Sequence, residues 1–196
     1  MPNKKVSLDP DDILSAEFEY IANSAFQANE DRSKAASFFL VSVGALVATI
    51  FGAGQDVLSA QTYLVLAGLF FVLTLLGGLT ISQLARLRAA WHEAARAMNQ
   101  IKDYYNAELK GNDLHKAFRW RTETLPMPYK RDSISFTTAL EVALLSGLTF
   151  GTSAYFLQLS LGSTNPVWWI TLGAGGVAFF LELFFYKSIL TKARQA

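Results

Sequence analysis

Three long stretches of this 196-residue chain are almost free of charged residues, and this limits its possible folds more than any other feature. Residues 35–55 and 57–85 contain no Asp, Glu, Lys or Arg, and residues 133–186 contain only Glu141 and Glu182. A helix needs about 20 largely apolar residues to cross the bilayer core. The first two stretches are therefore long enough for one crossing each, and the third for two.

Turn-forming residues at 161–166 divide the third stretch, and Pro166 is well placed to begin a new helix. A soluble bundle with buried central helices is the alternative, but so short a chain has too little polar helix to cover four helices that are apolar all round. We predict an all-α integral membrane protein with four transmembrane helices, at about residues 36–53, 62–83, 135–158 and 167–187.

The predicted transmembrane helices pair into two hairpins. Residues 1–121 hold a cytoplasmic helix, the first hairpin and a second cytoplasmic helix. Residues 122–134 are an interfacial linker, and residues 135–196 are the second hairpin with a short cytoplasmic tail. Proline is absent from residues 11–53 and 62–110, so each helix of the first hairpin can continue about 30 Å past the membrane.

Apolar residues recur with helical spacing on both of these extensions. On the first they are Leu14, Phe18, Ile21, Ala25 and Ala28. On the second they are Leu84, Leu87, Trp91, Ala94, Met98, Ile101 and Tyr105. The second set follows a heptad, so we expect the two stripes to pack together as in an antiparallel coiled coil. A subunit interface along the same stripes is a further possibility.

Lys and Arg are distributed unevenly along the chain. Four precede the first span, ten lie in residues 84–134 and three follow residue 186, whereas the hairpin loops at 54–61 and 161–166 contain none. By the positive-inside rule, both termini are cytoplasmic, and we expect a multi-pass protein of a bacterial inner (plasma) membrane. Residues 114–136 mix aromatic and basic side chains, which favours an interfacial segment, with recognition of an anionic lipid as the alternative.

Small residues recur at every fourth position of the third predicted span. They are Ala139, Ala143, Gly147 and Gly151. Gly175 lies on a similarly narrow face of the fourth span. Small residues at this spacing let helix backbones approach closely. We therefore predict that these five residues pack helices together, within one chain or between copies.

Two carboxylates lie within the predicted spans, about 7–10 Å inside the cytoplasmic boundary. An ionised carboxylate at this depth is costly unless it is paired, hydrated or protonated, so we expect neither Glu141 nor Glu182 to face lipid. One hypothesis is that they line an ion pathway or an acidic ring in an oligomer. The alternative is a structural role near the inner boundary, with Lys187 or Arg131 as partner. The candidate pathway includes the hydroxyls expected on the face of Glu141: Thr138, Thr149 and Thr152.

No combination of residues indicates an enzyme. The chain has no cysteine, and His92 and His115 are isolated. The glycines at 173–176 lie inside a predicted membrane helix and not after a strand, which argues against a phosphate-binding loop. The net charge of +1 argues against nucleic acid as a partner. We predict no catalytic site, no metal site and no cofactor.

The order of elements resembles the SLATT family: a cytoplasmic helix, a span, a short outer loop, and a second span that continues into a cytoplasmic helix. The resemblance covers residues 11–121 and includes the residues flanking the spans: Tyr20, Ala25, Arg32, Lys34, Arg86, Arg88 and Trp91. These small membrane proteins are proposed as pore-forming effectors of bacterial anti-phage and conflict systems. The second hairpin, residues 135–187, has no counterpart in that layout, and the family supplies no site residue.

The resemblance implies an oligomeric, pore-forming or channel-like protein that permeabilises the membrane when triggered through its cytoplasmic helices. Its expected partners are the lipid bilayer, further copies of the chain and a cytoplasmic signalling partner. A non-enzymatic membrane adaptor or assembly subunit is the first alternative, because it needs the same packing residues without an ion path. A small transporter is the second.

Overall fold

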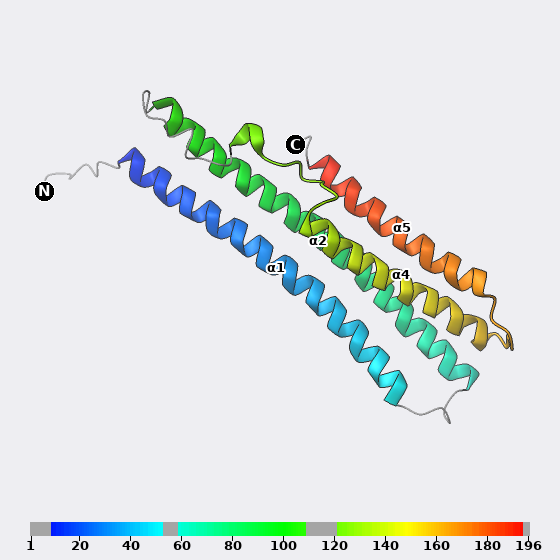
Figure 1. Ribbon diagram of the computed structural model, residues 1–196. Helices are drawn as coiled ribbons and strands as arrows, with labels where there is room; N and C mark the ends of the chain where they lie inside the picture. Colours follow the sequence, from blue (N-terminus) through cyan, green and yellow to red (C-terminus); the bar gives the residue numbers. More distant parts are fainter. Residues whose placement is uncertain (1–8, 53–58, 109–120, 194–196) are drawn as a thin grey trace, which may run out of the picture.

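The computed structural model describes residues 9–52, 59–108 and 121–193, and this part of the chain is helical with no strand (Figure 1). The prediction of an all-α protein is confirmed. Between the second and third long helices lies one short 3-10 helix, η2 (Thr122–Thr124). The four long helices are α1 (Pro10–Gly52), α2 (Ala60–Glu108), α4 (Ile134–Ser160) and α5 (Trp168–Lys192).

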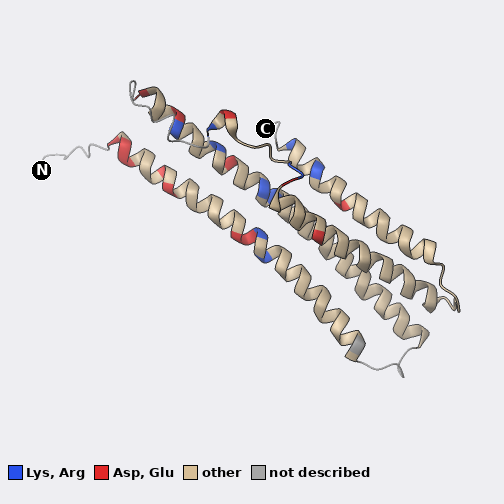
Figure 2. Ribbon diagram, viewed as in Figure 1, with Lys and Arg blue, Asp and Glu red and all other residues tan. Residues whose placement is uncertain are grey.

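Each long helix contains a segment that is long and apolar enough to cross a membrane. The mean hydropathy of these segments is 1.7, 2.5, 1.4 and 1.5 in chain order. Charged residues gather toward the end of the bundle where α1 begins and α5 ends (Figure 2). Length, hydropathy and this separation of charge identify a multi-pass membrane protein.

The outer surface of the bundle is apolar. Phe38 on α1 is 70% exposed, and Phe180 on α5 is 68% exposed. Trp169, near the start of α5, is 83% exposed. Such a surface is suited to contact with lipid tails, which solvate large apolar side chains.

α1 and α2 lie side by side and run in opposite directions (Figure 1). Their 43 and 49 residues correspond to about 65 and 74 Å of continuous helix. Near the end of α2, the Tyr105 hydroxyl donates to Asp11 Oδ1 at the start of α1, at 3.4 Å. One turn earlier, the Lys102 ammonium lies 5.8 Å from the centre of the Phe18 ring. The packed region thus extends well beyond the apolar segments.

The buried face of the α2 extension is rotated from the predicted stripe. Leu84 is buried, as predicted, but farther along the most buried residues each lie one position after a predicted one: Arg88, Ala95 and Asn99. The reason is that α2 has two neighbours here. α1 covers one side, and residues 121–133 cover another, so the residues between the two contacts are buried most deeply.

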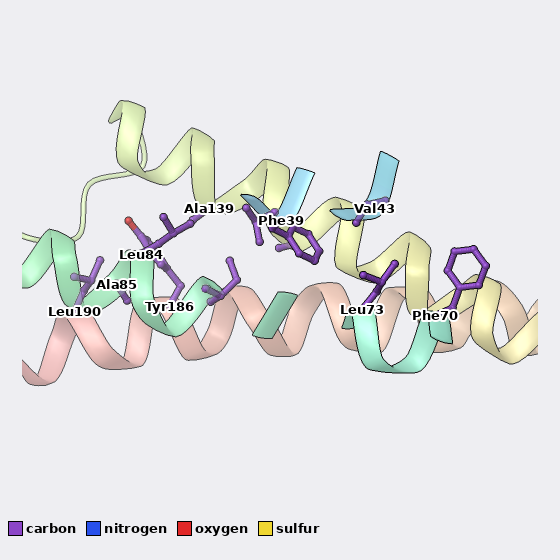
Figure 3. Packing of buried hydrophobic residues seen from close by; sticks show 12 residues of the cluster. Phe39, Val43, Phe70, Leu73, Leu84, Ala85, Ala139, Tyr186 and Leu190 are labelled. Atoms are coloured by element: carbon purple, nitrogen blue, oxygen red, sulfur yellow. The ribbon is translucent and has the colours of Figure 1, made fainter. Parts of the chain in front are cut away.

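α2 is the centre of the bundle, because it packs extensively against all three other long helices. α1 lies mainly on α2 and makes few contacts with α4. One apolar cluster joins the four helices (Figure 3). Its buried members are Phe39 and Val43 of α1, Phe70, Leu73, Ile81, Leu84 and Ala85 of α2, Ala139, Val142 and Ala143 of α4, and Tyr186 and Leu190 of α5.

A glycine permits the close approach of α2 to α4. A Cβ atom at Gly77 would lie 2.5 Å from Ser146 Oγ on α4 and 3.1 Å from the Phe39 ring on α1. These distances are shorter than van der Waals contact, so a side chain here would push the helices apart. Gly77 therefore sets the spacing at which the polar groups of α2 and α4 meet.

We expect Gly77→Ala to lower the free energy of unfolding by about 1–3 kcal/mol, because the added methyl group overpacks a contact among three helices. The measurement is denaturant unfolding of the purified protein in detergent. Gly68→Ala on the same helix is the matched control, since nothing lies within 4 Å of a Cβ there. Equal unfolding free energies for the two variants would contradict this account of α2–α4 packing.

Candidate functional site

Glu141 lies on α4 with its side chain exposed, at the edge of a groove between α1 and α4. The groove has a volume of about 300 Å³ and exists because α1 packs on α2 and only touches α4. Thr138 lines it beside Glu141, and its hydroxyl donates to Ile134 O of its own helix at 3.0 Å. The polar residues on the α1 side are Asn29, Arg32, Ser33 and Ser37.

The groove brings together two charges of opposite sign without pairing them. Arg32 and Glu141 both line it, but they form no ion pair among the described residues. Burial lowers the pKa of Arg32, which lies three residues before the first charge-free stretch. The side chain of Glu141 is thus left exposed and without an ion pair among the described residues.

Glu182 lies in a different environment, at the junction of α2, α4 and α5. Its side chain is 8% exposed, and Oε1 is hydrogen-bonded to the Ser146 hydroxyl of α4. A Cβ atom at Gly78 of α2 would lie 3.7 Å from the same oxygen. The second oxygen, Oε2, is buried and has no hydrogen-bond partner among the described residues.

The two carboxylates therefore do not share a cavity within one chain. Glu141 faces α1 from α4, whereas Glu182 faces α2 and α4 from α5. Neither cation considered as a partner reaches Glu182. The Lys187 ammonium lies 6.0 Å from the centre of the Tyr129 ring, and Arg131 is exposed.

The three threonines expected beside Glu141 occupy three environments. Only Thr138 lines the groove with it. Thr149 is buried and shares a 3.0 Å hydrogen bond with Thr74 of α2. Thr152 donates to Leu148 O of its own helix and lines an apolar groove between α4 and α5. Helical phase predicts which residues share a face of α4. The helices that pack on that face change along the helix axis, so residues on one face meet different neighbours.

The predicted small residues lie at helix contacts within the chain. A Cβ atom at Gly147 of α4 would lie 2.8 Å from Gly175 O of α5, and one at Gly151 would lie 3.0 Å from Thr171 O. Ala139 and Ala143 are fully buried in the apolar cluster. Gly147, Gly151 and Gly175 let α4 and α5 approach each other closely.

A row of serines on α4 was missed at the sequence level. Ser146 lies 3.3 Å from Thr74 O, Ser153 donates to Ala67 O at 2.8 Å, and Ser135 is hydrogen-bonded to the Tyr186 hydroxyl at 2.9 Å. With Thr149, these positions follow one face of the helix, and that periodicity is the available signal. It is a weak one, because hydroxyls in membrane helices also bond to their own backbone, as Ser42 does here.

Residues 121–133, the connecting segment, lie along the extension of α2. The Arg88 Nε–H donates to Pro128 O at 3.3 Å, and the Arg88 guanidinium stacks on Trp91 at 4.4 Å from the ring centre. The Thr122 hydroxyl donates to Asp103. This segment includes most of the predicted interfacial linker. The aromatic and basic residues at 114–120 fall outside the described part of the chain.

His92 ties the connecting segment to α2, and it lies seven residues beyond the charge-free stretch that ends at residue 85. Its Nε2–H donates to Pro126 O at 3.0 Å. Burial lowers the pKa of His92 below its ordinary value of 6.5, and nearby Arg88 and Arg96 act in the same direction, whereas the hydrogen bond opposes them. The histidine that looked incidental in the sequence therefore holds a structural contact.

We expect the connecting segment to loosen as the pH falls below about 6.5, because undocked His92 binds a proton more readily than docked His92. The contact loses its stabilising effect over the pH range between 6.5 and the lower pKa of docked His92. Hydrogen exchange of residues 121–133 against pH measures this loss, expressed as protection relative to the intrinsic exchange rate at each pH. His92→Gln keeps an N–H donor without titrating, so its protection should not change over this range. The same response in that variant would contradict the assignment.

Comparisons with known proteins give no match: no protein-family model, no curated protein and no solved structure is similar to this chain. Within the described residues, no group of three or more His, Asp or Glu side chains is placed to hold a metal ion. The candidate sites are therefore defined by geometry alone. They are an exposed carboxylate in a polar groove and a buried carboxylate among hydroxyl groups.

Proposed function

We propose that this protein self-associates in the membrane and that its copies together form a path for ions, opened from the cytoplasmic side. The observation that supports this most is the exposed carboxylate of Glu141. It lies seven residues inside α4, which is about 10 Å along the helix axis. In a single copy surrounded by lipid, that carboxylate would be solvated poorly.

An ionised carboxylate next to lipid costs several kcal/mol, and a second subunit or a column of water removes that cost. The groove beside Glu141 already presents hydroxyl, amide and guanidinium groups. If copies associate through this face, the Glu141 carboxylates approach one another and form a ring that favours cations. α1, held mainly by α2, is the helix whose movement would widen the groove.

The fold offers a way to transmit a trigger. A partner that binds the cytoplasmic extensions of α1 and α2 would act on the connecting segment through Arg88 and His92. That segment leads directly to Ser133, whose hydroxyl caps α4 by accepting from Phe136 N. A change in the extensions is thereby passed to the helix that carries Glu141.

In this proposal the chain is an effector of the bacterial inner membrane, as the resemblance to the SLATT family implies. The uneven distribution of Lys and Arg supports cytoplasmic termini and cytoplasmic helical extensions. Its partners are the lipid bilayer, further copies of the chain and a cytoplasmic signalling protein. Induced expression in a bacterial host should then collapse the membrane potential, whereas an adaptor or transporter would leave it intact.

Because the chain contains no cysteine, single cysteines can report its orientation. In intact cells, we expect a membrane-impermeant maleimide to label Ser163→Cys in the α4–α5 turn and not Glu123→Cys in η2. Both residues are exposed in the structure, so permeabilised cells, in which both should react, serve as the control. Labelling of Glu123→Cys from outside would reverse the proposed orientation.

We expect Glu141→Gln to reduce cation flux through the purified protein in liposomes by a factor of about 5 or more, because it removes the charge of the ring. A dye assay of ion release measures the flux. Glu123→Gln makes the same chemical change outside the spans and should conduct as the parent does. Equal flux for Glu141→Gln and the parent would remove Glu141 from the pathway, and no flux from the parent protein would favour the adaptor.

A further inference from the structure

Glu182 is the one acidic side chain buried among the described helices, and the groups around it form a continuous network. Ser146 lies between Glu182 Oε1 on one side and Thr74 O, 3.3 Å away, on the other. Thr74 and Thr149 share a 3.0 Å hydrogen bond, and the Thr149 hydroxyl donates to Ser146 O at 2.8 Å. The network links α2, α4 and α5 at the level of Gly77 and Gly78.

The number of hydrogen atoms available for hydrogen bonds in this network determines the protonation state of Glu182. A serine hydroxyl carries one hydrogen. Ser146 nevertheless faces two groups that can accept it, the Thr74 carbonyl and the Glu182 carboxyl group. If Glu182 is ionised, Ser146 can satisfy only one of the two, and Oε2 remains buried with part of the negative charge. If Glu182 carries a proton, it donates to Ser146, and Ser146 donates to Thr74 O.

We propose that Glu182 is a proton-binding site inside the bundle, occupied at neutral pH when α5 is packed on α2 and α4. The ligand is a single proton taken up from the aqueous phase by the carboxylate. The bound proton completes the chain of hydrogen bonds and removes a buried charge. This site does not depend on ions crossing the membrane; it depends only on lipid surrounding α4 and α5.

Among the residues that the structure describes, no charged group forms an ion pair with Glu182 that would stabilise its ionised form instead. Glu141 on α4 faces α1, and on α5 the Lys187 ammonium lies over Tyr129. On α2, Arg88 bonds to the connecting segment, and on α1 Arg32 lines the groove of Glu141. Three further cations of the described helices are exposed, and none forms an ion pair with Glu182: Lys34, Arg86 and Lys192. An ionised Glu182 would therefore be neutralised by none of them.

Loss of the proton has a structural consequence. A buried carboxylate with one unsatisfied oxygen is costly, and the cost falls if α5 moves and admits water. Glu182 therefore holds its proton more tightly when α5 is packed on α2 and α4 than when α5 has moved and water has entered. Glu182→Gln imitates the protonated acid, since its amide can donate to Ser146 as the acid does, so this variant should fold.

The test is infrared spectroscopy of the protein in lipid vesicles at neutral pH, as the difference between spectra in H₂O and in D₂O. The C=O stretch of a protonated carboxylic acid is separate from the bands of carboxylates. We expect one protonated-acid band that shifts in D₂O. It should be absent from Glu182→Gln and retained in Glu141→Gln. Because the readout is the proton itself, it is independent of the ion flux that tests the proposed function.

Ser146→Ala provides a second measurement. It removes the acceptor of the acid hydrogen, so the band should shift and not disappear. A parent spectrum without a protonated-acid band would overturn the proposal, and so would a band that persists in Glu182→Gln. A Ser146→Ala band identical to the parent band would show that the acid does not donate to Ser146 and would overturn the hydrogen-bond assignment on which the proposal rests.

Discussion

Lipid tails offer no hydrogen bonds, so every polar group within a membrane span must find its partner inside the protein. In this bundle, α2 and α4 meet this requirement together. Ser146 and Thr149 reach Thr74, and Ser153 reaches the backbone of Ala67. Gly77 is what brings the two helices close enough for these contacts. The outer surface carries large apolar side chains, and these hydroxyl groups lie between the helices.

The same constraint separates the two acidic residues of the second hairpin. Glu182 is buried within the polar network and contributes to the packing of α5. Glu141 is left outside it, in a groove whose other wall is α1. Glu182 is thus hydrogen-bonded within its own chain, whereas Glu141 has polar neighbours but no ion pair among the described residues. That contrast is why we assign the first to proton binding and the second to association and ion passage.

The fold class and the apolar segments could be predicted from the sequence because they depend on length and on the absence of charge, which are local properties. Residue contacts could not be predicted as well. The stripe at Ala94 and Met98 is displaced to Ala95 and Asn99, because the connecting segment covers a side of α2 that periodicity treats as free. Likewise, helical phase placed Thr152 with Glu141 but gave no information on which neighbour each would face.

α1 is attached to the rest of the molecule through essentially one partner. Over its length it rests on α2, and its apolar segment is only 17% buried. A long, stiff rod packed along a single neighbour behaves as a lever: displacement at the end where Asp11 contacts Tyr105 of α2 would be carried along the rod to its other end. The exposed face of this rod is suited to meet lipid, so a change in hydrophobic thickness, which tilts transmembrane helices, would act on α1 directly.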